Sequence, residues 1–233
     1  MRHFGVLIPS TNTTAEIEYS RLLPPLWQAH YARMATSSVN KTPFSPPRDE
    51  DVDYQARLLG TARVEAIFLL QTSASLFADN YCADVSGRIS AAAGGVPGFT
   101  SAMAIGEAMG ALGTRRVALV SPYSEPVNAS AKRYFEGRYG LTVVALEGFA
   151  ATDSYAIGQL GPENAREAFA RIDNPAIEAF IVPGGNFPTM ASIAGWEREF
   201  GKPVVTTNQA ALWATIRRLG SADRLPGLGR LLE

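Results

Sequence analysis

Four short apolar runs, each ending at small polar residues, constrain the fold of this chain more than any other feature. They span Phe4 to Ile8, Ala66 to Leu70, Val117 to Val120 and Ala179 to Val182. Uninterrupted runs of this length are typical of strands buried on both faces of a parallel sheet. Helical patterns separate or follow them, at Asp51 to Arg63, Ala102 to Leu112, Glu163 to Arg171 and Gln209 to Leu219. This alternation of strand and helix predicts an α/β fold.

The apolar runs recur in the second half of the chain at an offset of about 110 residues. Gly5 to Ser10 corresponds to Val117 to Pro122, and Ile67 to Thr72 corresponds to Phe180 to Gly185. We therefore predict two pseudo-symmetric, Rossmann-like half-domains with parallel sheets flanked by helices and an active-site cleft between them. The predicted lobes are residues 1–112 and 113–220, and residues 221–233 are predicted to be a C-terminal extension that returns to the first lobe.

The charge balance argues against several classes of partner. The chain of 233 residues carries 21 Lys and Arg against 22 Asp and Glu, with a formal net charge of -1. It therefore has no basic field with which to hold nucleic acid or a membrane surface, and we expect neither partner. Its single cysteine excludes an internal disulfide and a cysteine-rich structural zinc site. We expect a cytoplasmic protein.

Motifs of nucleophilic, metal or nucleotide chemistry are missing from the sequence. No GxGxxG, GxxxxGK[ST], HExxH or CxxC motif is present, and His3 and His30 do not stand in a nucleophile motif. We expect no cofactor and no bound metal. Cys82 falls in a helix-like stretch and is predicted to be a buried bystander thiol. The proline-rich segment from Lys41 to Asp51 is predicted to be a surface loop, with a lid over the cleft as the alternative.

Small polar side chains follow the two apolar runs of the first half. Ser10 and Asn12 come after the first run, and Gln71, Thr72 and Ser73 come after the second. Such residues cap helices, and they also direct hydrogen-bond donors toward an anion at a helix N-terminus. Because the theme appears at two strand ends that face the predicted cleft, we favour an anion-binding role.

The second half places a different set of neutral donors at the equivalent strand ends. Tyr123 follows the third apolar run, and Gly184, Gly185 and Asn186 follow the fourth. Neutral, fixed donors in a dry pocket stabilise the negative charge of an enolate or a carboxylate. Taken singly, a Gly-Gly pair is more often a turn, and a lone tyrosine is more often part of the core. Because Tyr123 and the Gly184-Gly185 pair both follow strands that end at the predicted cleft, we interpret them as parts of one site.

In combination, these segments resemble the aspartate/glutamate racemase superfamily, within the branch of maleate cis-trans isomerases and arylmalonate decarboxylases. The resemblance rests on Gly5 to Thr14, Thr72-Ser73, Pro122-Tyr123, Gly185-Asn186 and the closing Gly227 to Leu232. It implies a cofactor-free pocket for a small carboxylate, in which Asn12 contacts the carboxylate group. It also implies a homodimer.

One departure from the family pattern is central to the chemistry. The resemblance implies one catalytic cysteine from each lobe, but the corresponding positions are Gln71 and Gly184. Neither residue can act as a nucleophile or exchange a proton. Two-base racemisation and isomerisation through a cysteine adduct are therefore both in doubt, and the anion-binding frame is what survives.

Three functions remain open at this stage. The favoured one is an enzyme that stabilises an enolate-like intermediate of a small carboxylate or dicarboxylate, as a decarboxylase, lyase or isomerase, with Tyr123, Ser73 or water moving the proton. The second is a hydrolase or hydratase in which Gln71 orients water. The third is a non-catalytic protein that binds small acids. The predicted catalytic residues are Tyr123, Ser73 and Gln71, and the predicted binding residues are Ser10, Asn12, Thr72, Gly184, Gly185 and Asn186.

Overall fold

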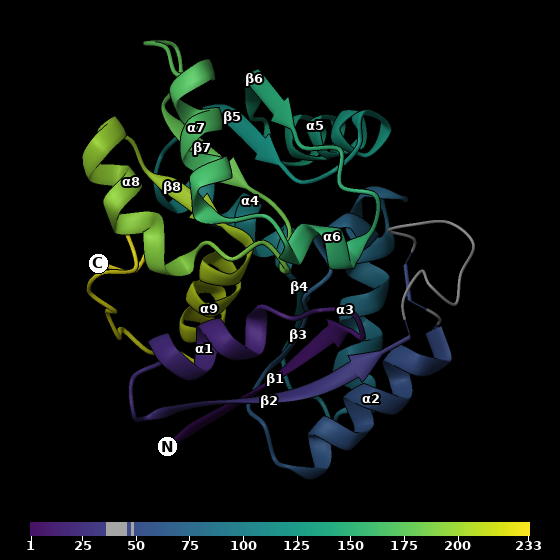
Figure 1. Ribbon diagram of the computed structural model, residues 1–233. Helices are drawn as coiled ribbons and strands as arrows, with labels where there is room; N and C mark the ends of the chain where they lie inside the picture. The colour runs from purple at the N-terminus through teal and green to yellow at the C-terminus, as the bar shows by residue number, and fades with distance from the viewer. Residues whose placement is uncertain (36–45, 48) are drawn as a thin grey trace.

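The computed structural model describes residues 1–35, 46–47 and 49–233 (Figure 1). Of the predicted loop from Lys41 to Asp51, residues 41–45 and 48 lie outside the described residues. Asp49 to Asp51 form the first turn of a helix, so this part of the loop prediction is wrong. The described residues form two four-stranded sheets, with strand orders β2-β1-β3-β4 and β6-β5-β7-β8, and every strand pairing is parallel. The predicted α/β fold with two parallel sheets is confirmed.

The two sheets repeat the same strand order along the chain. The first contains β1 (Arg2–Pro9), β2 (Trp27–Met34), β3 (Ile67–Leu69) and β4 (Gly98–Thr100). The second contains β5 (Arg116–Ser121), β6 (Thr142–Gly148), β7 (Ala179–Val182) and β8 (Val204–Thr206). In each sheet the first strand lies between the second and the third, so each half of the chain builds the same arrangement.

Helices cover both faces of both sheets. The α-helices are α1 (Ala15–Leu22), α2 (Asp49–Thr61), α3 (Tyr81–Ala92), α4 (Ser101–Ala111), α5 (Glu125–Tyr139), α6 (Ser154–Gly158), α7 (Pro162–Ile172), α8 (Ile193–Phe200) and α9 (Thr207–Arg218). The short 3-10 helices are η1 (Thr72–Leu76) and η2 (Met190–Ser192). Within the described residues, no helix is long and apolar enough to cross a membrane.

Alternate residues of each central strand enter different cores. In β1, Val6 and Ile8 face a core that α1, α4, α5 and α9 share with the second sheet, whereas Leu7 faces a core under α2 and α3. In β5, Val117 and Leu119 face the shared core, and Ala118 faces a third core beneath α7 and α8. Because successive side chains point to opposite faces of a strand, each central strand contributes residues to an inner core and to an outer core. Figure 1 shows α4 and α9 in the space between the two sheets.

The C-terminal segment is tied to both halves of the molecule. Trp27 donates its indole N–H to Asp223, and Gln209 donates its side-chain amide to the carbonyl oxygen of Leu228. Glu197 accepts the backbone N–H of Arg230 at 2.8 Å. The lobe boundaries after residues 112 and 220, and the assignment of the extension to the first lobe, stay predictions.

The close contact between β4 and α3 makes one glycine a test of the packing. A Cβ atom at Gly98 would lie 2.4 Å from the backbone oxygen of Ser86 and 3.0 Å from Cβ of Ile89. Gly98→Ala is therefore expected to lower the free energy of unfolding by about 1–3 kcal/mol, because backbone must move to relieve the clash. Chemical denaturation measures the change.

Gly87→Ala is the matched control, since Gly87 belongs to α3, the helix that contacts Gly98, and a Cβ there would meet no atom within 4 Å. It is expected to raise stability by about 0.5–1 kcal/mol through helix propensity. Equal effects of the two substitutions would contradict the packing described for β4.

Candidate active site

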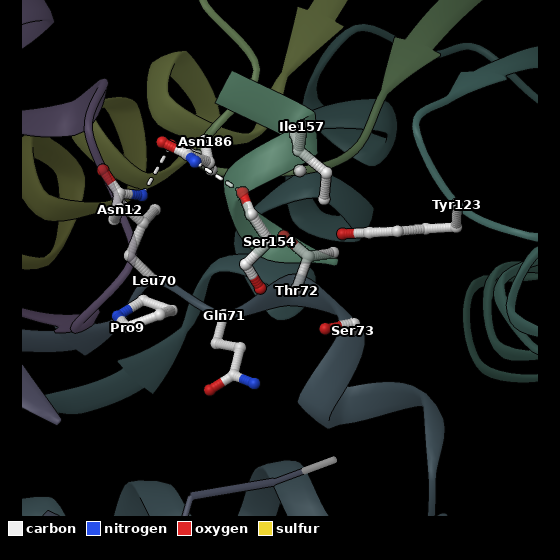
Figure 2. A pocket seen from close by; sticks show the side chains of 12 residues that line it. Pro9, Asn12, Leu70, Gln71, Thr72, Ser73, Tyr123, Ser154, Ile157 and Asn186 are labelled. Atoms are coloured by element: carbon white, nitrogen blue, oxygen red, sulfur yellow. Dashed lines mark hydrogen bonds between the residues drawn. The ribbon is translucent and has the colours of Figure 1, made fainter. Parts of the chain in front are cut away.

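The ends of four central strands surround a narrow cavity between the two sheets. Its volume is about 30 Å³, room for about two water molecules. The lining residues are Pro9, Asn12, Leu70, Gln71, Thr72, Ser73, Tyr123, Ser154, Ile157, Gly184, Gly185 and Asn186. All of these side chains are uncharged at neutral pH, so any anion bound there is held by neutral donors alone (Figure 2). The carboxyl ends of parallel strands are the usual location of a ligand site in such sheets.

Tyr123 is the centre of a hydrogen-bonded cluster in this cavity. Its side chain is 2% exposed, and its hydroxyl group is bonded to the Thr72 side chain and to the backbone N–H of Ser73. Figure 2 shows the phenol of Tyr123 pointing across the cavity toward Thr72. The hydroxyl group of Ser73 has no hydrogen-bond partner among the described residues, so it is available to a ligand.

Burial governs the protonation of Tyr123. Removal from water raises the pKa of its phenol well above the ordinary value, and the hydrogen bonds from Thr72 and Ser73 offset only part of this effect. The phenol therefore stays neutral throughout the physiological range. Such a group stabilises a neighbouring oxyanion by donating a hydrogen bond, and it gives up its proton only at high cost.

A chain of hydroxyl groups holds Thr72 in place. Its Oγ1 atom lies 3.1 Å from Ser101 Oγ and 3.1 Å from Thr207 Oγ1, and Thr207 accepts the backbone N–H of Gly184 at 2.8 Å. Thr72 and Ser101 come from the first half of the chain, whereas Thr207 and Gly184 come from the second. The cluster thus connects the strand ends of the two sheets through buried polar contacts.

Two asparagines join the same strand ends reciprocally. Asn12 donates its amide to the carbonyl oxygen of Gly185 at 3.0 Å, while Asn186 accepts the backbone N–H of Thr13 at 2.7 Å. The remaining amide groups are used as well. Asn12 accepts the N–H groups of Thr14 and Ala15 at the start of α1, and Asn186 donates to the carbonyl oxygen of Ser154 at 2.6 Å. Both asparagines line the cavity, but most of their hydrogen-bonding capacity is spent on holding its walls.

A buried carboxylate, Glu18 on α1, makes a further contact between the halves. It accepts the backbone N–H groups of Thr189 at 2.6 Å and Met190 at 2.8 Å, and the side-chain amide of Asn208 at 2.6 Å. Burial raises the pKa of Glu18, and these three hydrogen bonds counter that effect in part. Glu18 lies outside the cavity, so we assign it a supporting position behind the site.

The second-half strand end has an unusual backbone at Gly184. Its φ angle is +108°, and a Cβ atom there would lie 2.9 Å from Cγ of Pro122 and 3.7 Å from the hydroxyl oxygen of Tyr123. Side chains rarely adopt such a φ angle, so glycine is required by both conformation and space. The equivalent first-half position, Gln71, is 7% exposed and lines the cavity.

Most of the residues predicted from the sequence meet at the cavity. Ser10 does not line it, and this residue is exposed beside the end of β2, where its backbone N–H bonds to Met34. Four lining residues were not predicted as site residues. Pro9 ends β1 and Leu70 directly follows β3, whereas Ser154 and Ile157 belong to α6, a five-residue helix that follows no central strand. The only local signal there is Asp153, which caps the N-terminus of α6 by accepting the N–H of Ala156.

Cys82 lies away from the cavity. It is buried on α3, with its sulfur atom 3.2 Å from the hydroxyl oxygen of Tyr134 and 3.4 Å from Oγ1 of Thr100. Among residues 1–35, 46–47 and 49–233, no group of three or more His, Cys, Asp or Glu side chains is placed to hold a metal ion.

Two parallel sheets that enclose a cavity of neutral donors at their strand ends define a two-lobed α/β enzyme architecture suited to small anions. The chain belongs to the arylmalonate decarboxylase family, whose model matches residues 4–232. It is 25% identical to the maleate isomerase of Alcaligenes faecalis, over 98% of this chain and 95% of that protein. It is 27% identical to the arylmalonate decarboxylase of Bordetella bronchiseptica, again over 98% and 95% of the two chains.

A solved structure is also similar over the whole length. A cysteine-to-serine mutant of the Nocardia farcinica maleate cis-trans isomerase, with a covalently bound succinylcysteine intermediate, matches with a TM-score of 0.87 and 26% identity. The match covers 99% of this chain and 98% of the other. The predicted likeness to maleate isomerases and arylmalonate decarboxylases is confirmed, as is the prediction of an enzyme of isomerase or decarboxylase type.

The buried carboxylate of Glu18 is expected to make stability depend on pH. A folded-state pKa above the ordinary value of 4.5 means that the folded protein binds this proton more tightly than the unfolded chain does. The resulting stabilisation is complete below the ordinary pKa and is lost as the pH rises through the raised pKa. The free energy of unfolding of the native protein is therefore expected to fall, relative to that of Glu18→Gln, over this range.

Denaturation curves of both proteins at a series of pH values measure this difference, and circular dichroism verifies that the variant is folded. A difference that stayed constant, or that changed in the opposite direction, would show that hydrogen bonds rather than burial control the Glu18 carboxylate.

Proposed function

We propose that this protein is a cofactor-independent isomerase or decarboxylase that acts on a small carboxylate or dicarboxylate through an enolate-like intermediate, without cysteine catalysis. One observation carries the proposal. The Tyr123 phenol, the Thr72 side chain and Ser73 converge at one point of a cavity lined by uncharged side chains. Fixed neutral donors of this kind stabilise the charge of an enolate more than that of its parent acid, where the charge is already spread over a carboxylate.

Loss of CO₂ from a malonate-like acid is the reaction that this set of groups suits best. The bond between the α-carbon and one carboxylate breaks, CO₂ leaves, and the electron pair passes into the remaining carboxylate to form an enediolate. The α-carbon then takes one proton, ultimately from water. Tyr123, Thr72 and Ser73 would donate hydrogen bonds to the enediolate oxygens as their charge grows.

The proton must reach the α-carbon without a thiol. In the resemblance to the family, the cysteine positions fall on Gln71 and Gly184, and Cys82 lies outside the cavity. The Tyr123 hydroxyl group is already bonded to the Thr72 side chain and to the backbone N–H of Ser73, whereas the Ser73 hydroxyl group has no hydrogen-bond partner among the described residues and can turn toward the α-carbon. We therefore propose that the Ser73 hydroxyl group, or a water molecule held by it, delivers the proton.

Proton NMR in D₂O tests the proposal directly. The purified protein is mixed with a panel of malonates, maleate and other α-substituted dicarboxylates, and the spectra are followed for new products and for deuterium at the α-carbon. Product formation with deuterium at that carbon is expected. Ligand binding without product or exchange would instead favour a protein that binds small acids, and addition of water to the substrate would favour the hydratase in which Gln71 orients water.

Tyr123→Phe is expected to lower kcat about 10²–10³-fold, because one donor to the growing oxyanion is lost. Substrate affinity should change much less, since the charge of the ground state is smaller at that oxygen. Steady-state kinetics on the substrate found in the NMR panel give both quantities. Tyr54→Phe is the control, because this tyrosine is half exposed on α2, and its kinetics should be unchanged. Equal losses of kcat and affinity would contradict the role assigned to Tyr123.

Restoring a cysteine at the second-half position is expected to fail for a structural reason. Gly184→Cys forces a side chain onto a φ angle of +108° and against Pro122, so the free energy of unfolding should fall by about 1–3 kcal/mol without a gain of thiol-dependent activity. Gly195→Cys is the control, since the nearest atom to a Cβ there is 4.0 Å away. Denaturation curves compare the two variants. Unchanged stability of Gly184→Cys would contradict the requirement for glycine.

A further inference from the structure

A second and larger cleft lies outside the candidate active site. It has a volume of about 660 Å³ and separates α5 from the segment that connects η1 to α3. The residues that line it are Ser75, Leu76, Phe77, Ala78, Asp79, Ser130, Arg133, Tyr134, Gly137 and Arg138. This volume is within the range of sites for small molecules.

One face of α5 forms the floor of this cleft. Ser130, Arg133, Tyr134, Gly137 and Arg138 follow helical spacing, so their side chains lie on the same side of the helix. A Cβ atom at Gly137 would meet no atom within 4 Å, so the middle of the floor is open backbone. Two aromatic side chains line the cleft: Phe77, on the opposite wall, is 48% exposed, and Tyr134 belongs to the floor.

Two arginines, Arg133 and Arg138, lie beside the open floor, and no carboxylate among the described residues forms an ion pair with either of them. Each is nevertheless held by a neutral acceptor. Arg133 donates to Oγ of Ser130 at 2.8 Å, and Arg138 donates to the backbone oxygen of Asp79 at 3.4 Å. Positioned guanidinium groups with free N–H donors are suited to carboxylate and phosphate groups.

We propose that this cleft is a second binding site, for a small molecule that carries a carboxylate or phosphate group on a flat apolar ring. The anionic group would lie between Arg133 and Arg138, and the ring would lie over Gly137 against Phe77 and Tyr134. Among the described residues that line the cleft, only Asp79 is acidic, so the two arginines give the cleft a net positive charge. The proposal is independent of the reaction assigned to the cavity.

The position of the cleft connects it to the candidate active site. Thr72 and Ser73, at the start of η1, line the cavity, whereas Ser75 and Leu76, at its end, line the cleft. A ligand in the cleft therefore contacts the same short helix that holds two of the proposed donors. Binding at the two places must accordingly be distinguished by variants.

Isothermal titration calorimetry on the full chain tests the proposal with three probes: benzoate, phenyl phosphate and the neutral isostere benzamide. Benzoate and phenyl phosphate are expected to bind, and benzamide is expected to bind at least tenfold more weakly. The double variant Arg133→Gln/Arg138→Gln should weaken the binding of both anions by about tenfold or more, because charge-assisted hydrogen bonds are lost. The relative affinities of benzoate and phenyl phosphate tell which anionic group the site prefers.

Two controls make the outcome decisive. Arg198→Gln removes an exposed arginine of α8, a helix that contributes no residue to the cleft, and should leave binding unchanged. Ser73→Ala alters the cavity and should also leave it unchanged. Loss of benzoate binding in Ser73→Ala, equal binding of benzamide, or unaltered binding in the double arginine variant would each overturn the proposal. Circular dichroism of the double variant shows whether it is folded, and single substitutions replace it if it is not.

Discussion

Reciprocal hydrogen bonds between two asparagines and the opposite strand ends fix the geometry on which the site depends. Asn12 reaches from the first half to the carbonyl oxygen of Gly185, and Asn186 reaches from the second half to the backbone N–H of Thr13. The contact of Asn12 is buried and that of Asn186 is partly buried, so an unpaired amide or carbonyl group there would be costly. Separation of the halves would expose both amides at once, so these bonds set the distance across the cavity.

The helices between the two sheets also hold the halves together, through apolar packing rather than through hydrogen bonds. A parallel sheet needs apolar cover on both faces, and here the facing sides of the two sheets share one core, to which α4 and α9 contribute. The halves are therefore packed on common helices rather than resting against each other at a polar boundary. Apolar packing holds the two halves together. The hydrogen bonds of Asn12, Asn186 and Glu18 fix the position of one half relative to the other. Because the candidate site takes residues from both halves, its geometry depends on both the apolar packing and these hydrogen bonds.

Burial on both faces of a strand leaves an uninterrupted apolar run, and such runs predict structure correctly from the sequence. The central strands β1, β3, β5 and β7 follow from such runs, and the residues just after them supply most of the cavity wall. The edge strand β2 alternates buried and exposed residues and therefore contains no continuous apolar run. The edge strand β6 contains a short one, Val143 to Leu146, which was not among the four runs used to predict the sheets, and its exposed residues alternate with more buried ones. Ser154 and Ile157 depend on where α6 folds back, a tertiary fact with no local pattern. Asn12 shows that a residue type suited to an anion can instead be committed to the protein itself.

The backbone at Gly184 has a consequence for how such a site can change over evolutionary time. Because Pro122 occupies the space beside its α-carbon, a side chain can return there only after Pro122 or the local backbone has changed. The two positions are thus epistatic, and the order of substitutions matters. A chain with this pairing therefore has no single-step route to a thiol at position 184.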